Sequence, residues 1–521
     1  MAAHLSTAPE QPATLDKEKP PLSGIEETLL DNLAAVKALV YILQACFGPH
    51  GRRKLLVTAQ GETLCTSHST AILSALELDH PAARLLREAA YTQAEENGDG
   101  TTFVVLFTGA LMEQVVVMLR AGLPLANLRE SLAAATGRAL RLLPGLATLS
   151  VDPLVDPVPA LRAVVDTHTP SHSDYLAGLV GRACSAAREL DRSFDPQRVA
   201  ICLVPGAKLG DSCLLPGLAV GGMPCGQVTM VTGGAKVALF SCSFTVTSPQ
   251  PSAIPRFSTP SDLLWSSDEK AKDKATVLLD QLADAGINVV VIGGSIDKES
   301  LEHADRHGIL LVRVRFPKEM TRLSQVLSTT LQSDLTPPAV PGSCRRVCTQ
   351  ELKEGSAVVF EWEGGQPPAL TLVLRDATSE GLQGAGQAVQ HAIGVYGQLC
   401  QDARLLPGAG AVEMALAKEL LSLGSQLEGP ERTGILAFAQ ALQVVPSVLA
   451  ENAGLPVAET VAQLQSLHQA GDRLAGVGDE AIVDVATAQV WDSLRVKIRG
   501  LELAADVALG LSTEDEIGIS K

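Results

Sequence analysis

The most constraining feature of this sequence is where its two kinds of hydrophobic pattern fall. Near the amino-terminal end, apolar residues recur at helical spacing, at Ile25, Leu29, Leu30, Leu33, Val36, Val40 and Leu43. Short apolar runs typical of buried strands are concentrated in the middle, at residues 199–206, 237–244, 287–294, 309–316, 356–362 and 370–375. From Ala411 onward the helical pattern returns. The sequence therefore predicts helical, α/β and helical parts in chain order.

The order of these parts leaves the number of domains open. The 521 residues suffice for about three domains, and the proline-rich run at 149–160 marks a boundary. Residues 55–57 and 62–65 are expected to form two short strands, with a helix beginning near Ser69. One economical interpretation is a single helical domain made from both ends of the chain, with the α/β part inserted. Pattern alone does not establish that closure.

Charge and cysteine usage exclude several classes of protein. The net charge of −17 is unsuited to neutralising phosphates, so nucleic acid is not an expected partner. No CxxC pair occurs, and Cys344 and Cys348 lack a second ligand pair nearby, so dispersed thiols in a reducing compartment are expected. The first 22 residues have no apolar core like that of a secretory signal. We also expect no uncharged apolar stretch long enough to span a bilayer, and hence a soluble cytoplasmic protein.

Residues 97–105 read NGDGTTFVV, a polar turn that leads directly into an apolar run. Asn, Asp and Gly favour turns, and Asp or Thr caps a helix well, so an ordinary turn accounts for much of this stretch. A second interpretation is an anion site at a helix N-terminus, where amide groups attract phosphate. Hydroxyls of Thr101 and Thr102 can donate to phosphate, and Asp99 can hold Mg²⁺. The stretch alone leaves both interpretations open.

Two further glycine-containing turns stand at helix boundaries, FGPHG at 47–51 and PGAGAVEMA at 407–415. The second begins like a dinucleotide fingerprint, but Glu413 stands where the third glycine is needed and no clear strand precedes it. A nicotinamide-dependent enzyme is therefore disfavoured. No P-loop occurs around these turns, and the sequence has no GxSxG or HExxH motif.

Two histidine pairs have the four-residue spacing that could hold a metal on one helix face. Pro170 separates His168 from His172, so this pair is expected in a solvated loop. His303 and His307 could share a helix face, but no third ligand is evident from the sequence. A solvent-exposed helix face is the better interpretation of this second pair.

Several of these segments, in order and spacing, resemble the motifs of group II chaperonins, the family of the cytosolic T-complex chaperonin. The matching segments are GPHGRRK (48–54), TSHSTAIL (66–73), LDHPAARLL (78–86), GDGTT (98–102), LLPGAGAVEMALAKEL (405–420) and VWDSLRVKIRGLELAADVA (490–508). The resemblance covers about residues 22–517 and is greatest to theta-type subunits.

The resemblance implies an α/β multi-domain chaperonin fold. Such subunits have a mainly helical equatorial domain, a small intermediate domain and an α/β apical domain that binds unfolded substrate. The implied segments are a flexible tail at 1–23, equatorial segments at 24–148 and 406–521, intermediate segments at 149–216 and 371–405, and an apical domain at 217–370. The helical stretch near 262–286 would correspond to the apical protrusion that closes the lid of a double ring.

The resemblance also implies a site for ATP and Mg²⁺. The implied residues are Asp99 as the Mg²⁺ ligand, Gly100, Thr101 and Thr102 at the phosphates, Gly48 and Pro49 over the nucleotide, Gly408 and Gly410 near the base and ribose, and Asp492 at the ribose hydroxyls. Taken alone, each of these glycines is explained by a simple turn. Their joint spacing favours nucleotide binding.

The sequence departs from the family at the two carboxylates used for hydrolysis. His68 stands at the first position and His391 at the second, and a register shift of one would bring in Gln390 or Ala392, neither of them acidic. A positioned base contributes roughly 10²–10⁴-fold to such a reaction, and a neutral imidazole carries no negative charge. In addition, Ala409 replaces a glycine of the family's glycine triplet. Asp376 replaces a different glycine of the family, which follows the position of Arg375.

These observations predict an ATP-binding chaperone that assists the folding of unfolded proteins, alone or with other chaperonin subunits in a ring, and that hydrolyses ATP poorly. No catalytic residue is assigned, and whether the chain is an ATPase stays open, because a neighbouring subunit could compensate for the lost acids. The alternative is a non-hydrolysing adaptor that keeps the chaperonin shape and could remain monomeric.

Overall fold

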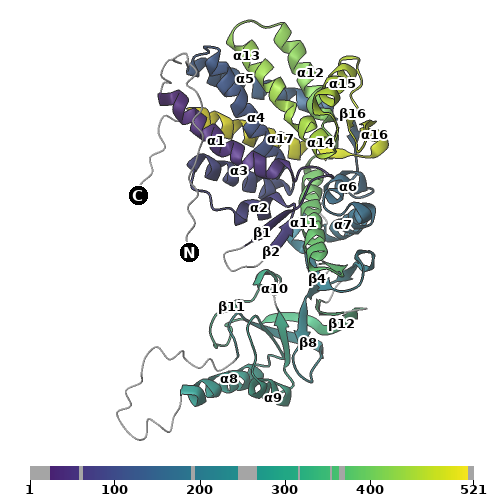
Figure 1. Cartoon of the computed structure of the whole chain (residues 1–521). Coiled ribbons are helices and arrows are strands. Elements are labelled where there is room, and N and C mark those ends of the chain that lie inside the picture. Colours follow the sequence, from purple (N-terminus) through teal and green to yellow (C-terminus); the bar gives the residue numbers. More distant parts are fainter. Residues whose placement is uncertain are drawn as a thin grey trace, which may run out of the picture.

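The computed structural model describes residues 24–57, 63–188, 194–244, 267–314, 317–352, 355–362 and 370–513. The tail expected at 1–23 and the first residues of the helical stretch expected near 262–286 lie outside these residues. The molecule is elongated, with a helical part at one end, a sheet-containing part at the other and a narrow connecting part between them (Figure 1). Because elements from both ends of the chain form the helical part, the chain passes through the connecting part twice.

The helical part is assembled from both ends of the chain. Its first helices are α1 (Gly24–Gln44), α2 (Ser69–Ala75), α3 (Pro81–Asn97), α4 (Thr101–Arg120) and α5 (Leu125–Leu142). Its later helices are α12 (Ala411–Ser425), α13 (Pro430–Leu442), α14 (Val444–Asn452), α15 (Val457–Gln469), α16 (Val485–Ala488) and α17 (Leu494–Thr513). Helices α13 and α17 pack against α4 and α5. The side-chain amide of Asn32 donates to the backbone carbonyl of Leu511 at 3.1 Å, so the two ends share one core.

Helix α4 is the centre of this core because it is apolar on almost every side. Its Phe107 packs edge-on against Phe438 of α13, with ring centroids 5.2 Å apart. By length and composition, α4 and the run Pro430–Asn452 could each cross a membrane. Residues 433–450 of this run carry no charge, so the expectation that no uncharged apolar stretch is long enough was wrong. Both are mostly buried inside the protein, as core helices of a globular domain are.

Short strands complete the helical part. Strand β1 (Lys54–Val57) pairs antiparallel with β2 (Thr63–Thr66), close to the two strands expected from the sequence. A second small sheet has the order β18-β15-β3 and comprises β18 (Trp491–Ser493), β15 (Arg404–Pro407) and β3 (Leu149–Ser150). Strands β16 (Ala475–Val477) and β17 (Ile482–Asp484) form a third pair. These strands end at the turns from which the site is built.

The connecting part packs three helices against a three-stranded sheet. The helices are α6 (Val158–Asp166), α7 (Ser173–Ala187) and α11 (Ser379–Gln401), and the strands are β4 (Val199–Pro205), β14 (Leu370–Asp376) and β5 (Cys213–Pro216). Strand β14 lies between the other two, parallel to β4 and antiparallel to β5. Buried apolar side chains of all three helices form one cluster with this sheet. The 23-residue helix α11 runs from this sheet up to the helical part (Figure 1).

The sheet-containing part is built on eight strands with the order β6-β13-β12-β8-β9-β10-β7, and β11 pairs with β8. The strands are β6 (Leu218–Val220), β7 (Gly222–Pro224), β8 (Met230–Phe240), β9 (Val289–Ile292), β10 (Leu310–Val314), β11 (Leu331–Gln332), β12 (Gly342–Leu352) and β13 (Gly355–Glu361). Buried residues of α8 (Ser267–Asp284) and α9 (Lys298–Arg306) pack with one set of strand side chains, and those of α10 (Pro317–Leu327) with the alternate set. Alternation along β8 and β9 thus gives two cores, one on each face.

Each apolar run assigned to a strand from the sequence overlaps a strand, but other strands were missed. Strand β15 leads directly into the turn at 407–415, where no strand was expected. The long strand β12 was also missed: its sequence GSCRRVCTQEL carries two arginines, and a bulge between Cys344 and Arg346 shifts its register on β8. Cys344 is buried before the bulge, and both Val347 and Cys348 are buried after it. The bulge therefore interrupts the period-two alternation that marks a strand in a sequence.

Glu319 of α10 makes the stability of the sheet-containing part depend on pH. One of its carboxylate oxygens accepts from the Gly221 amide at 3.2 Å, and the other is buried without a partner. Burial raises the pKa of Glu319 to about 7. The charged form is therefore disfavoured in the folded state, and the resulting stability loss grows as the pH rises from about 4.5 to about 7.

We expect Glu319→Gln to be more stable than the wild type by about 1–2 kcal/mol at pH 7.5 and no more stable at pH 4.5. The amide keeps the acceptor for Gly221 and removes the buried charge. Urea denaturation at both pH values measures the difference. Exposed Glu302, which contacts Lys298 at 3.7 Å, provides the control, since Glu302→Gln is expected to change stability by less than about 1 kcal/mol. Equal effects of Glu319→Gln at both pH values would contradict the assignment.

Candidate functional site

A cavity of about 450 Å³ lies between the helical part and the connecting part. Its wall includes eight of the nine residues that the sequence implicated in nucleotide binding: Gly48, Pro49, Asp99, Gly100, Thr101, Thr102, Gly410 and Asp492. The ninth, Gly408, lies just behind the wall, where its amide donates to the Val490 carbonyl at 3.0 Å. Segments far apart in the sequence thus meet around one space.

The turn GDGTT brings the N-terminus of α4 to this cavity. Gly98 and Gly100 adopt left-handed φ values of 77° and 87°, which ends α3 and begins α4 within three residues. One carboxylate oxygen of Asp99 accepts from the Gly100 amide at 2.7 Å. The Thr101 hydroxyl is buried without a hydrogen-bond partner. A buried hydroxyl at a helix N-terminus that lacks a partner fits a phosphate oxygen.

The electrostatics around Asp99 fit a divalent cation. Burial raises the pKa of Asp99, the Gly100 hydrogen bond opposes this, and the negative charge of Asp492 adds to it. Two carboxylates on one cavity wall repel each other, and the positive charge of Lys497 offsets this repulsion only in part. A bound Mg²⁺ would reverse this and favour the ionised carboxylates. Asp99, at the N-terminus of α4, is placed where it could hold such an ion.

Lys497 is a second charged feature of the cavity, and the sequence analysis missed it. Its ammonium contacts Glu413 at 2.6 Å and Asp492 at 3.1 Å, and lies 4.6 Å from the centre of the Phe103 ring. Burial alone would lower the pKa of Lys497, but the charges of both carboxylates and their hydrogen bonds raise it. No spacing in the sequence marks it, because its partner Glu413 lies 84 residues away.

The glycine turns hold the backbone close to neighbouring helices. A Cβ on Gly48 would lie 2.5 Å from Leu449, and one on Gly410 would lie 3.0–3.4 Å from Pro446. Both glycines have φ values near 80°, so a side chain would be strained as well as crowded. Ala409, which stands where the family has glycine, has a φ of 54°. The alanine therefore occupies a left-handed conformation that glycine would adopt without strain.

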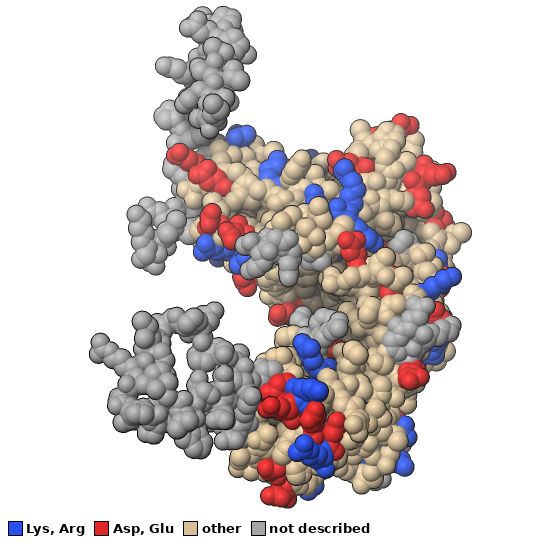
Figure 2. All heavy atoms as spheres, turned by 60° about the horizontal axis from the view of Figure 1, so that its bottom comes forward, with Lys and Arg blue, Asp and Glu red and all other residues tan. Residues whose placement is uncertain are grey.

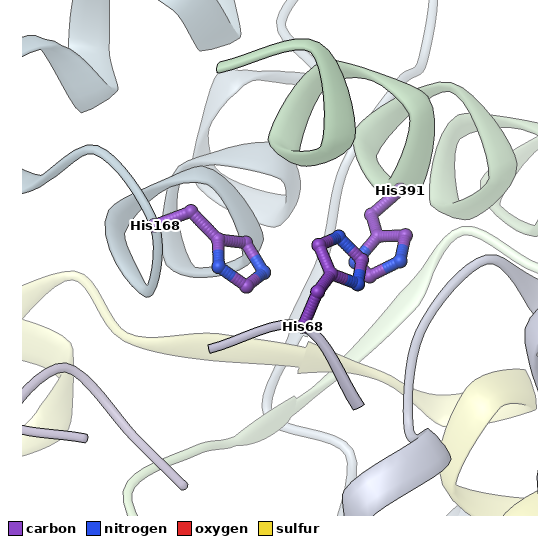
Figure 3. Close-up of side chains that lie close together, drawn as sticks. All are labelled: His68, His168 and His391. Atoms are coloured by element: carbon purple, nitrogen blue, oxygen red, sulfur yellow. The ribbon is translucent and has the colours of Figure 1, made fainter. Parts of the chain in front are cut away.

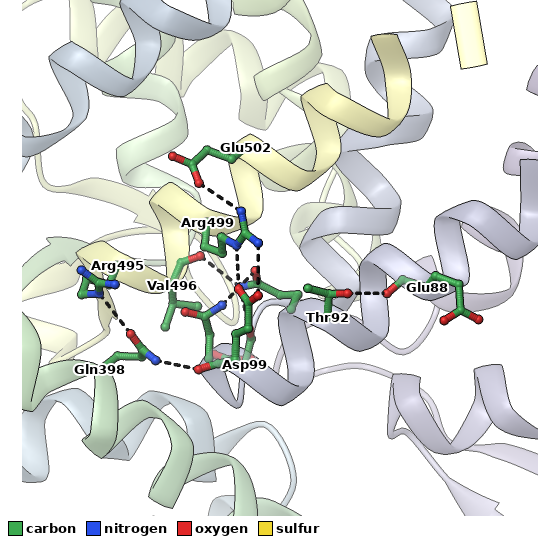
Figure 4. A network of polar contacts seen from close by, with 11 residues as sticks. Glu88, Thr92, Asp99, Gln398, Arg495, Val496, Arg499 and Glu502 are labelled. Atoms are coloured by element: carbon green, nitrogen blue, oxygen red, sulfur yellow. Dashed lines mark hydrogen bonds and ion pairs between the residues drawn. The ribbon is translucent and has the colours of Figure 1, made fainter. Parts of the chain in front are cut away.

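A network of polar contacts fixes the GDGTT turn to α17 and α11 (Figure 4). The Gln93 amide donates to the carbonyls of Asp99 and Val496, at 2.9 Å and 3.1 Å. Gln398 of α11 donates to the Glu96 carbonyl at 2.6 Å and accepts from Arg495 at 3.1 Å. These bonds hold the backbone of Asp99 in place without using its carboxylate.

His68 and His391 lie side by side on the cavity wall. Their ring centroids are 4.1 Å apart. The neighbours of His391 point elsewhere, since Gln390 is exposed and Ala392 is buried in the core of the connecting part. Of these three neighbouring positions, His391 is therefore the one whose side chain reaches the cavity. Four carboxylates line the cavity, those of Asp99, Asp166, Asp479 and Asp492.

His168 lies in the same wall, so the expectation that it is a solvated loop residue was wrong. Its ring stacks on that of His68, with centroids 4.7 Å apart and planes 5° from parallel. His172 takes no part in this cluster. The sequence analysis compared His168 only with His172. The rings that His168 contacts come from other elements, which spacing within one segment does not reveal.

The pair His303 and His307 also has a neighbour that the sequence did not reveal. Asp280 of α8 contacts the Nε2 atoms of both rings, at 2.8 Å and 2.9 Å. This cluster lies in the sheet-containing part and is largely exposed. The face seen in Figure 2 carries Lys and Arg side chains interspersed with Asp and Glu, without a continuous basic patch among its described residues.

Comparison with known proteins gives a consistent result. A sequence profile of the TCP-1/cpn60 chaperonin family matches residues 39–520. The chain is 53% identical to human T-complex protein 1 subunit theta-like 2, over 98% of this chain and 92% of the relative. It is 32% identical to T-complex protein 1 subunit theta of Macaca fascicularis, over 100% of this chain and 96% of the relative. The similarity to theta-type chaperonin subunits expected from the motifs is confirmed, and the chain belongs to the TCP-1/cpn60 chaperonin family.

Proposed function

We propose that this chaperonin chain binds Mg-ATP in the cavity at the N-terminus of α4 and converts it to ADP slowly or not at all. As a family member it has a chaperone role in protein folding. The observation that carries the proposal is the placement of His68 and His391, 4.1 Å apart, on the wall that also contains the GDGTT turn. The binding residues are present while two expected acids are replaced.

The residues present are suited to holding the nucleotide. The α4 N-terminus and the hydroxyls of Thr101 and Thr102 would bind phosphate oxygens, and Asp99 would hold Mg²⁺. Gly48 with Pro49 on one side, and the turn at 408–410 with Asp492 on the other, would enclose the remainder. Mg²⁺, when bound, neutralises phosphate charge.

The histidines are poor replacements for carboxylates in hydrolysis. Burial lowers the pKa of His68 to about 3, and that of His391 well below its ordinary value. Both rings are therefore neutral near pH 7 and provide no negative field for an attacking water. A base with such a low pKa is also a weak proton acceptor. Asp166 is the one further acid on the connecting side of the cavity.

We further propose that the chain has the domain organisation of its family, with equatorial (24–148, 406–521), intermediate (149–216, 371–405) and apical (217–370) segments, and that α8 belongs to the apical protrusion. Relatives named as subunits of T-complex protein 1 support assembly with other subunits in a cytoplasmic ring. Unfolded or partly folded proteins would then be its clients.

A single-turnover experiment tests the slow conversion. Purified protein is mixed with a substoichiometric amount of base-labelled ATP and Mg²⁺, and the ratio of bound ATP to ADP is followed over time. We expect ATP to be retained and to remain largely unconverted, and Asp99→Ala to abolish retention. Restoring acids with His68→Asp and His391→Asp is expected to raise the conversion rate by about 10²-fold or more. ADP formed by the wild type as fast as by the double variant would contradict the proposal.

The replaced acids also favour a second function, that of an adaptor with the chaperonin shape and no turnover. Native gels and light scattering separate the two, since an adaptor would remain monomeric with ATP present. A ring-sized assembly that also retains ATP would support the first function.

A further inference from the structure

We propose that His68, His168 and His391 form a Zn²⁺ site that joins the helical part to the connecting part. The proposal stands on these three imidazoles and does not depend on how fast ATP is converted. It concerns a metal other than Mg²⁺ and ligands other than Asp99. The two proposals can therefore fail separately.

The three rings come from three separate elements and turn toward one another (Figure 3). His68 precedes α2 in the helical part, His168 follows α6, and His391 lies on α11. Ring centroids are 4.1 Å, 4.7 Å and 5.7 Å apart, and one nitrogen of each ring lies within 4.8 Å of the others. A metal at their centre would link two parts of the molecule through neutral ligands.

The spacing is close to what tetrahedral zinc requires. With Zn–N bonds of about 2.0–2.1 Å, the three ligating nitrogens lie about 3.3 Å apart. The present nitrogens, within 4.8 Å of one another, would close by at most about 1.5 Å. Rotation of the side chains about χ1 and χ2 can provide movements of that size without shifting the backbone.

An unpartnered ligand atom marks the place. The Nε2 atom of His68, a residue only 4% exposed, is buried without a hydrogen-bond partner of ordinary geometry, and the backbone carbonyl of Gln387 is an acceptor near this ring. Native proteins rarely leave a buried polar atom in this state without a bound group to satisfy it. A metal at the centre of the three rings would satisfy it directly.

Neighbouring hydroxyls leave the remaining nitrogens free. Ser67 Oγ lies 3.3 Å from Nδ1 of His168, and Thr70 Oγ1 lies 3.4 Å from Nδ1 of His68. Such contacts to the non-ligating nitrogen orient metal-binding imidazoles in known zinc sites. With Nδ1 of each residue engaged in this way, Nε2 is the nitrogen left to bind a metal.

The protonation of the rings supports metal binding. Burial lowers the pKa of His68 to about 3 and that of His168 to about 4, and His391 shifts in the same direction for the same reason. All three imidazoles are therefore neutral near pH 7, which is the form that binds metal. Three imidazoles with a fourth position open to the cavity are a ligand set that zinc accepts.

Simple packing of the rings and two rival metal sites make different predictions from the three-histidine site. If the rings only pack together, no metal will bind them tightly. The cluster of Asp280, His303 and His307 is a rival zinc site elsewhere in the protein, and the ten free cysteines are rival ligands. A decisive experiment must distinguish the three-histidine site from both rivals.

The test uses untagged full-length protein freed of metal, titrated with Zn²⁺ against a chromophoric chelator, together with Co²⁺ as a spectroscopic substitute. We expect one tight Zn²⁺ per chain, nitrogen and oxygen ligation by X-ray absorption, and a Co²⁺ spectrum without thiolate charge transfer. His391→Gln should weaken binding by more than about 100-fold, since loss of an outer-shell partner already costs about 10–100-fold. His303→Gln should leave the tight site unchanged.

Zn²⁺ should also raise the melting temperature of the wild type and of His303→Gln, but not that of His391→Gln. This readout uses the wild type itself and so remains informative if one variant folds poorly. The absence of tight binding in the wild type would overturn the proposal. Tight binding with sulfur ligation, or tight binding abolished by His303→Gln, would overturn it as well.

Discussion

Replacing Lys497 with methionine is expected to lower the free energy of unfolding by about 3–5 kcal/mol. The Lys497 side chain is 12% exposed, and its ammonium lies 2.6 Å from the carboxylate of Glu413, whose side chain is 1% exposed. One oxygen of Glu413 already lacks a hydrogen-bond partner. Methionine fills similar space but leaves the buried carboxylate without a counter-charge. Urea denaturation measures the loss, with unfolding followed by far-UV circular dichroism, a signal dominated by helices.

A surface ion pair provides the matched control for this substitution. Lys37 contacts Glu113 at the same distance, 2.6 Å, but the two side chains are 55% and 47% exposed. Lys37→Met is expected to cost no more than about 1 kcal/mol, because water screens an exposed pair. Similar losses for the two variants would show that burial does not set the contribution of Lys497. A Glu413→Gln change made together with Lys497→Met should recover part of the loss.

Replacing Gly394 with alanine is expected to destabilise the junction between α11 and the helical part. A Cβ on Gly394 would lie 2.6 Å from the Gly98 Cα and 3.1 Å from the Gly98 nitrogen. These are backbone atoms and cannot move aside as a flexible side chain can. The change should therefore cost about 3 kcal/mol, the upper end of the usual range for overpacking.

Helix α11 contains its own control for Gly394→Ala. A Cβ on Gly384 would meet no atom within 4 Å, so Gly384→Ala should stabilise the helix by about 0.5–1 kcal/mol. The opposite signs follow from the same substitution in the same helix. Thermal unfolding of both variants measures the effects, and a stabilising Gly394→Ala would contradict the close approach at Gly98. Hydrogen exchange at the GDGTT amides should increase in Gly394→Ala alone.

Features set by local sequence were predicted well. The GDGTT turn at the α4 N-terminus, the start of α12 at Ala411 and the apolar strand runs each depend on residues close together in the chain. Their turn chemistry and apolar spacing are visible without knowledge of the fold. Assembly of the turns into one site followed from the family resemblance.

Features that depend on distant partners were not predictable from pattern. Lys497 pairs with Glu413, 84 residues away, and His68 meets rings from two other elements. No periodicity connects such residues, so His168 was placed in a solvated loop. Apolar composition has a similar limit, because it does not by itself distinguish a core helix such as α4 from a membrane-spanning one.

The hydrogen bond between Asn32 and Leu511 has a consequence for how the protein is made. Its two residues are 479 positions apart, and at roughly 5–20 residues per second a ribosome needs about 25–100 s to synthesise that stretch. During this interval the nascent α1, α4 and α5 have no α17 to cover their apolar faces. The sheet-containing part has its strands and helices close together in the chain and can form first. The nascent chain of this chaperone-family protein is therefore prone to aggregation for most of its synthesis.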